Sequence, residues 1–189
     1  MPTTASMKHL TRPDTEGEMH LPDLNRATRE CMMDEIVLDQ RTHRLYFSKR
    51  LNEKGAADYP GLLLKAAAFH DARWFCRELG RDRLTFFEPI RGGRKIRKTP
   101  GNAHIVLGES EFNRYYIRGL CRRAIDEGHG HLIVYRARNP LTAREESEDK
   151  IGELVAPEPI LADLRTSIGM EPFLGYPSGP NSGISLRLP

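Results

Sequence analysis

Residues 110–128, SEFNRYYIRGLCRRAIDEG, carry the strongest pattern in the chain and decide the predicted fold. Ser110 can cap the start of a helix, and Gly128 can adopt the left-handed conformation that ends one. Glu109 and Glu111 suit the positive end of the helix dipole. The stretch therefore predicts an amphipathic helix, whose apolar face is formed by Phe112, Tyr116, Leu120 and Ala124 with Ile117, Cys121 and Ile125 beside them.

A second face of this helix is basic, because Arg114, Arg118 and Arg122 recur at every fourth residue. One interpretation is a solvated ridge that pairs with acidic residues elsewhere in the chain. The other is a ridge that binds phosphate groups or the carboxylates of a partner. Both interpretations place the three guanidinium groups at the surface.

The composition limits the choice of protein class. With 189 residues, of which 39% are hydrophobic, the chain can form one domain with a proper core and some extensions. The formal charge of +3 comes from 29 basic and 26 acidic residues, so any attraction to polyanions requires local clusters. Cys31, Cys76 and Cys121 lie far apart without a CxxC pair, which argues against disulfides or a structural zinc site and favours a reducing compartment. No segment has the length of a signal peptide or a membrane span, so we expect a soluble cytoplasmic protein, or one within a particle assembled in the cytoplasm.

Before and after the central helix the sequence predicts a hairpin, a second helix and three strands. Residues 35–47 contain two β-prone runs around a short polar turn, which indicates a hairpin. Residues 58–79 place apolar side chains on one helical face, with Asp58 as the cap and Gly80 at the end. Strands are expected at residues 84–87, 104–107 and 131–135.

Between residues 44 and 136 these elements follow the order strand, helix, strand, strand, helix, strand, which is typical of a ferredoxin-like βαββαβ fold. We therefore predict an α+β protein with an antiparallel sheet, two helices on one face, an additional N-terminal hairpin strand and extended arms at both ends. The expected organisation is an N-terminal arm at residues 1–30, an α+β core at 31–140, a charged loop and short helix at 141–169, and an extended tail at 170–189.

The predicted tail is rich in Pro, Gly and Ser but also carries apolar side chains. A pure spacer has no use for such residues, so we expect them to fill pockets on this chain or on a neighbouring subunit. The candidate partner-contact residues are Phe173, Leu174, Tyr176, Ile184 and Leu186.

A cluster of basic residues follows the strand predicted at 84–87. In the predicted fold it joins two strands, so it forms a loop that can follow a phosphate backbone, and two glycines within it permit close approach. An acidic protein surface, or solubility alone, are the alternatives. The candidate anion-binding residues are Arg91, Arg94, Lys95, Arg97 and Lys98, together with the Arg114, Arg118 and Arg122 ridge.

No motif for catalysis or cofactor binding is present. The chain lacks a Gly-x-Ser-x-Gly elbow, a phosphate-binding GxxxxGK[ST] loop and a dinucleotide-binding GxGxxG turn. His129 and His131 have a spacing that suits a metal, but the predicted sheet keeps them apart from His43 and His104. We therefore expect no catalytic residues, no metal and no cofactor.

These observations favour a non-enzymatic structural subunit of a larger oligomeric particle, of the phage-like shell, ring or connector type, with arms that contact neighbouring subunits. The expected partners are copies of the same chain or other subunits of the complex, and no membrane. The alternative is a module that binds nucleic acid through its basic residues. A nuclease-type enzyme is the third and least favoured class.

Overall fold

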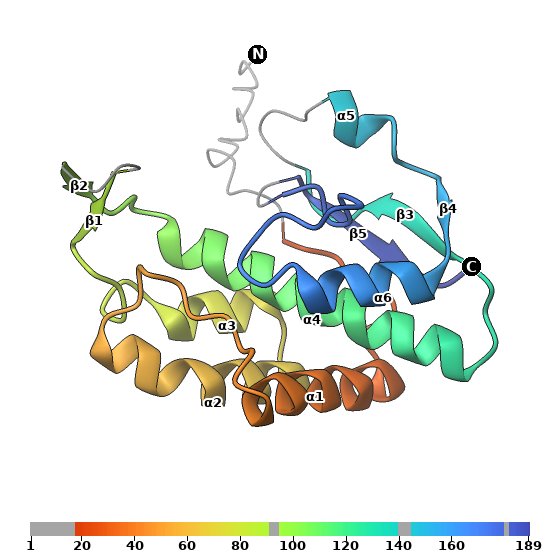
Figure 1. The fold of residues 1–189 in the computed structure, drawn as a ribbon, viewed down its shortest axis with the longest axis horizontal. Helices are drawn as coiled ribbons and strands as arrows, with labels where there is room; N and C mark the ends of the chain where they lie inside the picture. The colour runs from red at the N-terminus through yellow and green to blue at the C-terminus, as the bar shows by residue number, and fades with distance from the viewer. Residues whose placement is uncertain (1–17, 91–94, 140–144, 180–181) are drawn as a thin grey trace, which may run out of the picture.

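The computed structural model describes residues 18–90, 95–139, 145–179 and 182–189, and it is built around one long helix. Figure 1 shows this helix, α4, running through the middle of the molecule, with α1, α2 and α3 on one side and α6 and a small sheet on the other. The elements in chain order are α1 (Arg26–Arg41), α2 (Glu53–Phe69), α3 (Ala72–Leu79), β1 (Phe87–Pro89), β2 (Ile96–Lys98), α4 (Ala103–Asp126), β3 (Leu132–Arg136), α5 (Glu145–Glu148), β4 (Leu154–Val155), α6 (Pro157–Thr166) and β5 (Ile184–Arg187).

Helix α4 is the helix that the sequence predicted, but it begins earlier than expected. The strand predicted at 104–107 is wrong, because these residues form the first turn of α4, and Ala103 and Leu107 continue its buried face. Ser110 lies inside the helix, where its hydroxyl donates to the Val106 carbonyl at 2.6 Å instead of capping the end. Gly128 follows the helix with a φ of 76°, as the sequence predicted.

The hairpin predicted at 35–47 is also wrong, because residues 26–41 form α1. Asn25 caps this helix by accepting a hydrogen bond from the Thr28 amide. The β-branched pair at 36–37 suggested a strand, but the buried residues follow a helical period. They are Thr28, Met32, Glu35, Ile36 and Asp39.

The single helix predicted at 58–79 is two helices, α2 and α3, that meet at His70. The break lies there because the Asp71 carboxylate accepts a hydrogen bond from the Trp74 amide at 2.7 Å and so caps α3. Asn52, not Asp58, caps α2. Gly80 ends α3 with a φ of 50°, as expected.

The strands form two small antiparallel sheets within the described residues. The strand predicted at 131–135 is confirmed as β3, the centre of a sheet with the order β4-β3-β5. Strands β1 and β2 pair only with each other, and Leu84 forms an isolated bridge with Leu51. The α+β class is therefore confirmed, whereas the ferredoxin-like βαββαβ order is not. No helix in the described ranges has both the length and the apolar character needed to cross a membrane.

Most of the predicted C-terminal tail packs on its own domain. Ile184 and Leu186 are fully buried in β5, where Leu186 lies opposite Val134 of β3. The side-chain amide of Asn113 in α4 donates to the Ile184 carbonyl at 2.9 Å and fixes the strand on the helix. The expected outward-reaching tail is therefore wrong for this part, because the core has an open sheet edge that the strand covers. Phe173, by contrast, is 93% exposed.

The N-terminal arm predicted at 1–30 also packs in part on its own domain. Residues 1–17 lie outside the described part of the chain, and α1 begins at Arg26. Between them the chain runs beside the sheet, since the His20 amide donates to the Ala137 carbonyl at 2.8 Å and the Leu188 amide donates to the Asp23 carboxylate at 2.9 Å. The two ends of the described chain are thus joined to the same sheet.

Truncating the tail at a buried and at an exposed position tests this arrangement. We expect Leu186→Ala to lower the free energy of unfolding by about 2–5 kcal/mol, because it leaves a cavity in the core. We expect Phe173→Ala to change it by less than about 0.5 kcal/mol. Urea denaturation followed by circular dichroism measures both, and equal losses would contradict the buried position of β5.

Candidate functional site

The basic ridge predicted on α4 is not a surface. Arg118 is 1% exposed and lies between α4 and α1, where it donates to the Glu35 carboxylate at 2.7 Å and to the Asp39 carboxylate at 2.5 Å. Burial disfavours the ionised carboxylate of Glu35, but hydrogen bonds from Arg165 and the charge of Arg118 outweigh it and lower the pKa of Glu35. Arg118, Glu35 and Asp39 form a buried ion cluster between α1 and α4, and Arg165 joins α6 to it through Glu35.

The other two arginines of the ridge also contact groups of the same chain. Arg114 is buried and donates to the carbonyl oxygens of Ser167 and Met170, both at 2.7 Å. Arg122 is partly exposed and lies 3.6 Å from the carboxylates of Asp34 and Glu35. The prediction of an exposed ridge is therefore wrong for Arg114 and Arg118, whose donors are directed to groups inside the fold.

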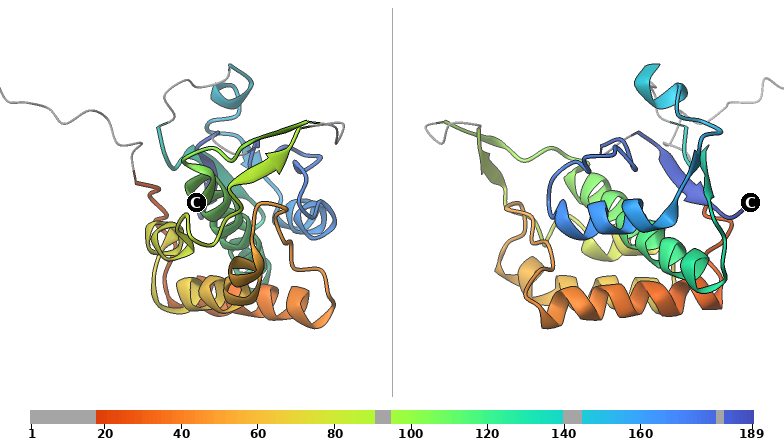
Figure 2. Two further views of the ribbon diagram at one scale, coloured as in Figure 1. Left: turned by 90° about the vertical axis from the view of Figure 1, so that its left-hand side faces the viewer. Right: turned by 45° about the vertical axis from the view of Figure 1, so that its right-hand side comes forward.

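The described part of the basic loop predicted at 91–98, residues 95–98, belongs to a hairpin, β1–β2, that projects from one end of the molecule (Figure 2). Lys95, Arg97 and Lys98 are exposed on it, whereas Arg91 and Arg94 lie outside the described residues. Arg97 lies 2.6 Å from the carboxylate of Glu88 in β1, and Arg50 from the body contacts the same carboxylate. These hydrogen bonds, that of Arg50 foremost, lower the pKa of Glu88 and keep it charged, so the base of the hairpin is tied to the body.

The hairpin also carries large apolar side chains that no described part of the chain covers. Phe86 is 79% exposed, Phe87 61% and Ile96 71%. Sequence reasoning assigned residues 84–87 to a strand of a four-stranded sheet and so missed their exposure. The signal available was the sequence itself, since two adjacent phenylalanines cannot both face the same core from one strand.

An acidic and apolar surface lies at the opposite end of the long axis, where Figure 1 places β4. Strand β4 is an edge of the three-stranded sheet, and Leu154 within it is 62% exposed. Ile151 is exposed beside it, as are the acidic residues Asp149 and Glu153. We call Asp149, Ile151, Glu153 and Leu154 the β4 surface.

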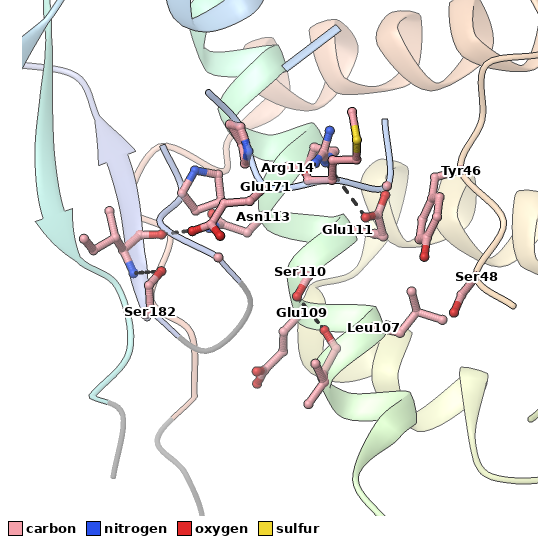
Figure 3. A pocket seen from close by; sticks show the side chains of 18 of the residues that line it. Tyr46, Ser48, Leu107, Glu109, Ser110, Glu111, Asn113, Arg114, Glu171 and Ser182 are labelled. Carbon is pink, nitrogen blue, oxygen red and sulfur yellow. Dashed lines mark hydrogen bonds and ion pairs between the residues drawn. The ribbon is translucent and has the colours of Figure 1, made fainter. Parts of the chain in front are cut away.

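A pocket of about 220 Å³ opens on the first half of α4 (Figure 3). Its walls include α4 itself, the 46–50 segment, the loop at 169–172 and the segments 177–179 and 182–184. Tyr46, Leu107, Met170 and Pro172 supply apolar atoms, and Glu111 lines the pocket from the helix. Sequence reasoning placed Glu111 in a first helical turn, but because α4 begins at Ala103 this glutamate falls on the inner face.

Glu111 is the unusual group of this pocket. It is buried, its Oε1 lies 3.9 Å from Arg114, and its Oε2 makes no hydrogen bond within the described part of the chain. Burial raises the pKa of Glu111 to about 7, although the charges of Arg114 and Arg118 lower it. The carboxyl therefore changes its charge near neutral pH.

The described histidines are not grouped with other metal ligands, and Leu174 and Tyr176 of the tail make contacts within their own chain. Within the described ranges no three His, Cys, Asp or Glu side chains are grouped so as to hold a metal ion. His129 pairs with Glu127 at 3.2 Å on the surface. Tyr176 is half-buried and donates to Glu153, while Leu174 lies in a loop whose amides donate to Asp163.

Comparison with known proteins gives no relative, since no family model, curated protein or solved structure matches the chain.

Proposed function

We propose that the protein is a structural subunit that assembles with copies of itself, and that the β1–β2 hairpin of one copy docks on the β4 surface of the next. The observation that carries the proposal is the exposure of Phe86, Phe87 and Ile96 on one projecting hairpin. Grouped exposed apolar side chains on a soluble domain mark a contact surface, and each buried phenylalanine contributes about 1.5–3 kcal/mol to association.

The β4 surface suits this hairpin in charge and in its open strand edge. The hairpin presents Lys95 and Lys98 beside its apolar residues, and the β4 surface presents Asp149 and Glu153 beside Leu154. Opposite charges around an apolar centre set the orientation of a contact and favour the correct partner. Edge strand β4 also offers backbone groups to which another strand can add.

The two surfaces lie at opposite ends of the molecule (Figure 1). A contact between two different surfaces of the same chain is a head-to-tail contact, which produces a ring where the rotation closes and a filament where it does not. A shell, ring or connector subunit is a protein of this kind. Self-association through the hairpin thus replaces the predicted role of the tail, most of which packs on its own domain.

Mixing two variants tests the head-to-tail arrangement. The hairpin variant is Phe86→Ser with Ile96→Glu, and the edge variant is Asp149→Lys with Leu154→Lys. Each variant alone is expected to stay monomeric, with association weakened by about 3 kcal/mol or more, which is over a hundredfold. A 1:1 mixture of the two is expected to form a dimer and nothing larger, because one intact hairpin meets one intact β4 surface.

Light scattering coupled to size-exclusion chromatography measures these masses over a concentration series. The matched control is Phe173→Ala, which removes an even more exposed apolar side chain elsewhere and is expected to assemble like the wild type. A wild type that stays monomeric at every concentration, or a mixture that stays monomeric, would contradict the proposal.

Binding of nucleic acid by the hairpin is the second candidate, because Lys95, Arg97 and Lys98 are exposed together on it. Contacts to phosphates predict an affinity that falls steeply with salt and depends little on base sequence. In the same experiment, wild type that remains monomeric but shifts DNA or RNA in a gel, with the shift lost in Lys95→Ala/Lys98→Ala, would favour this function over self-assembly.

A further inference from the structure

The pocket on α4 has a pattern of hydrogen-bonding groups that selects one kind of ligand. Most donors in its walls already have acceptors. Arg114 donates to three carbonyl oxygens, Arg50 donates twice to Glu88, and Asn113 donates to the Ile184 carbonyl. Ser110 donates to the Val106 carbonyl, and the buried Arg138 lies 3.5 Å from the carboxylate of Glu109, which lines the same pocket. The pocket therefore has few donors to offer to an anion.

Unlike these donors, one acceptor in the pocket wall lacks a hydrogen-bond partner within the described ranges. Glu111 Oε2 has no donor among the described residues, although a buried carboxylate oxygen without one costs about 1–3 kcal/mol or more. Glu171, an exposed carboxylate, lines the same pocket at its mouth. Figure 3 shows Glu111 between Arg114 and Tyr46, in the wall that the 169–172 loop faces. A ligand that satisfies this pocket must donate hydrogen bonds, and a positive charge strengthens them.

The remaining walls suit a short aliphatic chain. Leu107, Met170 and Pro172 supply apolar atoms, and the ring of Tyr46 packs against Gly169, where an added Cβ would lie 2.3 Å from the ring. An aromatic face near a cation adds attraction. A volume of about 220 Å³ holds an alkyl chain of a few carbons with its head group.

From these contacts we infer that the pocket binds a primary ammonium group through Glu111, carried by a free alkylamine or by a lysine side chain. The ammonium donates to the Glu111 carboxylate, and its alkyl chain lies along Leu107 and Met170. This site is independent of the hairpin contact, since none of these residues belongs to the hairpin or to the β4 surface.

Binding depends on pH in a defined direction. Glu111 accepts an ammonium as a carboxylate, and burial keeps it protonated up to about pH 7. The groups that act on it are Arg114 and Arg118 of α4, which favour the charged form, and Asp39 of α1, which opposes it; Tyr59 of α2 also lies within its field. The affinity therefore rises with pH, by about tenfold per unit below 7, and levels off above it.

Titration of the full chain with n-butylammonium chloride tests the inference, with tetramethylammonium as a cation of similar charge that cannot donate. The resonances of 13C-labelled glutamate carboxyls report the result. We expect saturable binding of n-butylammonium, a fall in the apparent pKa of Glu111 on binding, and no saturable binding of tetramethylammonium. An N-acetyl-lysine amide in a parallel titration distinguishes the sources: tighter binding than n-butylammonium assigns the site to lysine side chains, and weaker binding assigns it to free amines.

Glu111→Gln is the matched variant, and Glu30→Gln, on the exposed side of α1, is its control. Folding of the Gln variant is not at risk from lost charge, because the raised pKa of Glu111 means that its ionisation destabilises the folded state; this loss grows from the unfolded pKa of about 4.3 to the folded pKa of about 7 and is constant above it. Glu111→Gln is expected to weaken n-butylammonium at least about tenfold at pH 8, and Glu30→Gln not at all. Equal binding by Glu111→Gln and wild type, equal binding of the two cations, or no saturable binding by the wild type would each overturn the inference.

Discussion

Arg118→Ala is expected to lower the free energy of unfolding by about 3–5 kcal/mol, because it leaves the buried carboxylates of Glu35 and Asp39 without their main partner. The Tyr115 hydroxyl, which donates to Asp39 at 2.8 Å, and Arg165, which donates to Glu35 at 2.5 Å, cannot replace a guanidinium that contacts both acids. Urea denaturation at pH 7 measures the loss.

An exposed ion pair gives the control for this prediction. Arg26 and Glu30 lie 2.8 Å apart on the solvent side of α1, so Arg26→Ala is expected to cost less than about 1 kcal/mol. The pH dependence gives a second readout. Because its partners lower the pKa of Glu35 in the folded state, that stabilisation is complete above the unfolded pKa of about 4.3 and is lost as the pH falls through the lower folded value. A loss below about 1 kcal/mol for Arg118→Ala would show that the cluster is solvated, as the sequence suggested.

Gly119→Ala is expected to destabilise the protein by about 1–3 kcal/mol or more, although alanine is the better helix former. Gly119 lies where α4 crosses α1. An added Cβ would lie 2.8 Å from the Met32 backbone nitrogen and 2.9 Å from the Thr28 carbonyl oxygen, so the two helices would have to move apart. Thermal unfolding followed by circular dichroism measures the change.

The matched control is a helical glycine with open space around it. Gly61 lies in α2, and an added Cβ there would meet no atom within 4 Å. Gly61→Ala is therefore expected to stabilise the protein by about 0.5–1 kcal/mol, through helix propensity alone. Opposite signs for the two substitutions support the α1–α4 crossing, and a stabilising Gly119→Ala would contradict it.

The parts of the fold that the sequence predicted are those in which local pattern and packing agree. Helix α4 has both an apolar face and a terminal glycine. Strand β3 is a short apolar run that lies in the middle of its sheet, between β4 and β5. Helix α1 was missed because its buried face contains Glu35 and Asp39, which a hydrophobic pattern counts as polar. Partners far along the chain make that face suitable for burial, above all Arg118, which lies 83 residues from Glu35, and Arg165, which lies 130 residues from it.

The candidate sites were predicted less well, for the same reason. Residues 95–98 of the basic segment lie on a projecting hairpin, and the adjacent pair Phe86 and Phe87 indicates only that one of the two rings cannot face a shared core, not that both are exposed. The sequence prediction placed Glu111 directly after a cap at Ser110, but the observed cap is Asn102, eight residues earlier, and this places Glu111 on the buried face. Local patterns therefore located both segments and gave the wrong environment for their side chains.

The central claim is that the hairpin of one copy contacts the β4 surface of another, and intermolecular disulfide formation tests it most directly. Ile96→Cys and Leu154→Cys are prepared as separate proteins, and each is oxidised mildly alone, in a mixture of the two, and in a mixture with Phe173→Cys as the control pair. The account predicts that the Ile96→Cys and Leu154→Cys mixture forms a covalent dimer much faster than either protein alone or than the control mixtures. Equal rates in all samples would contradict it.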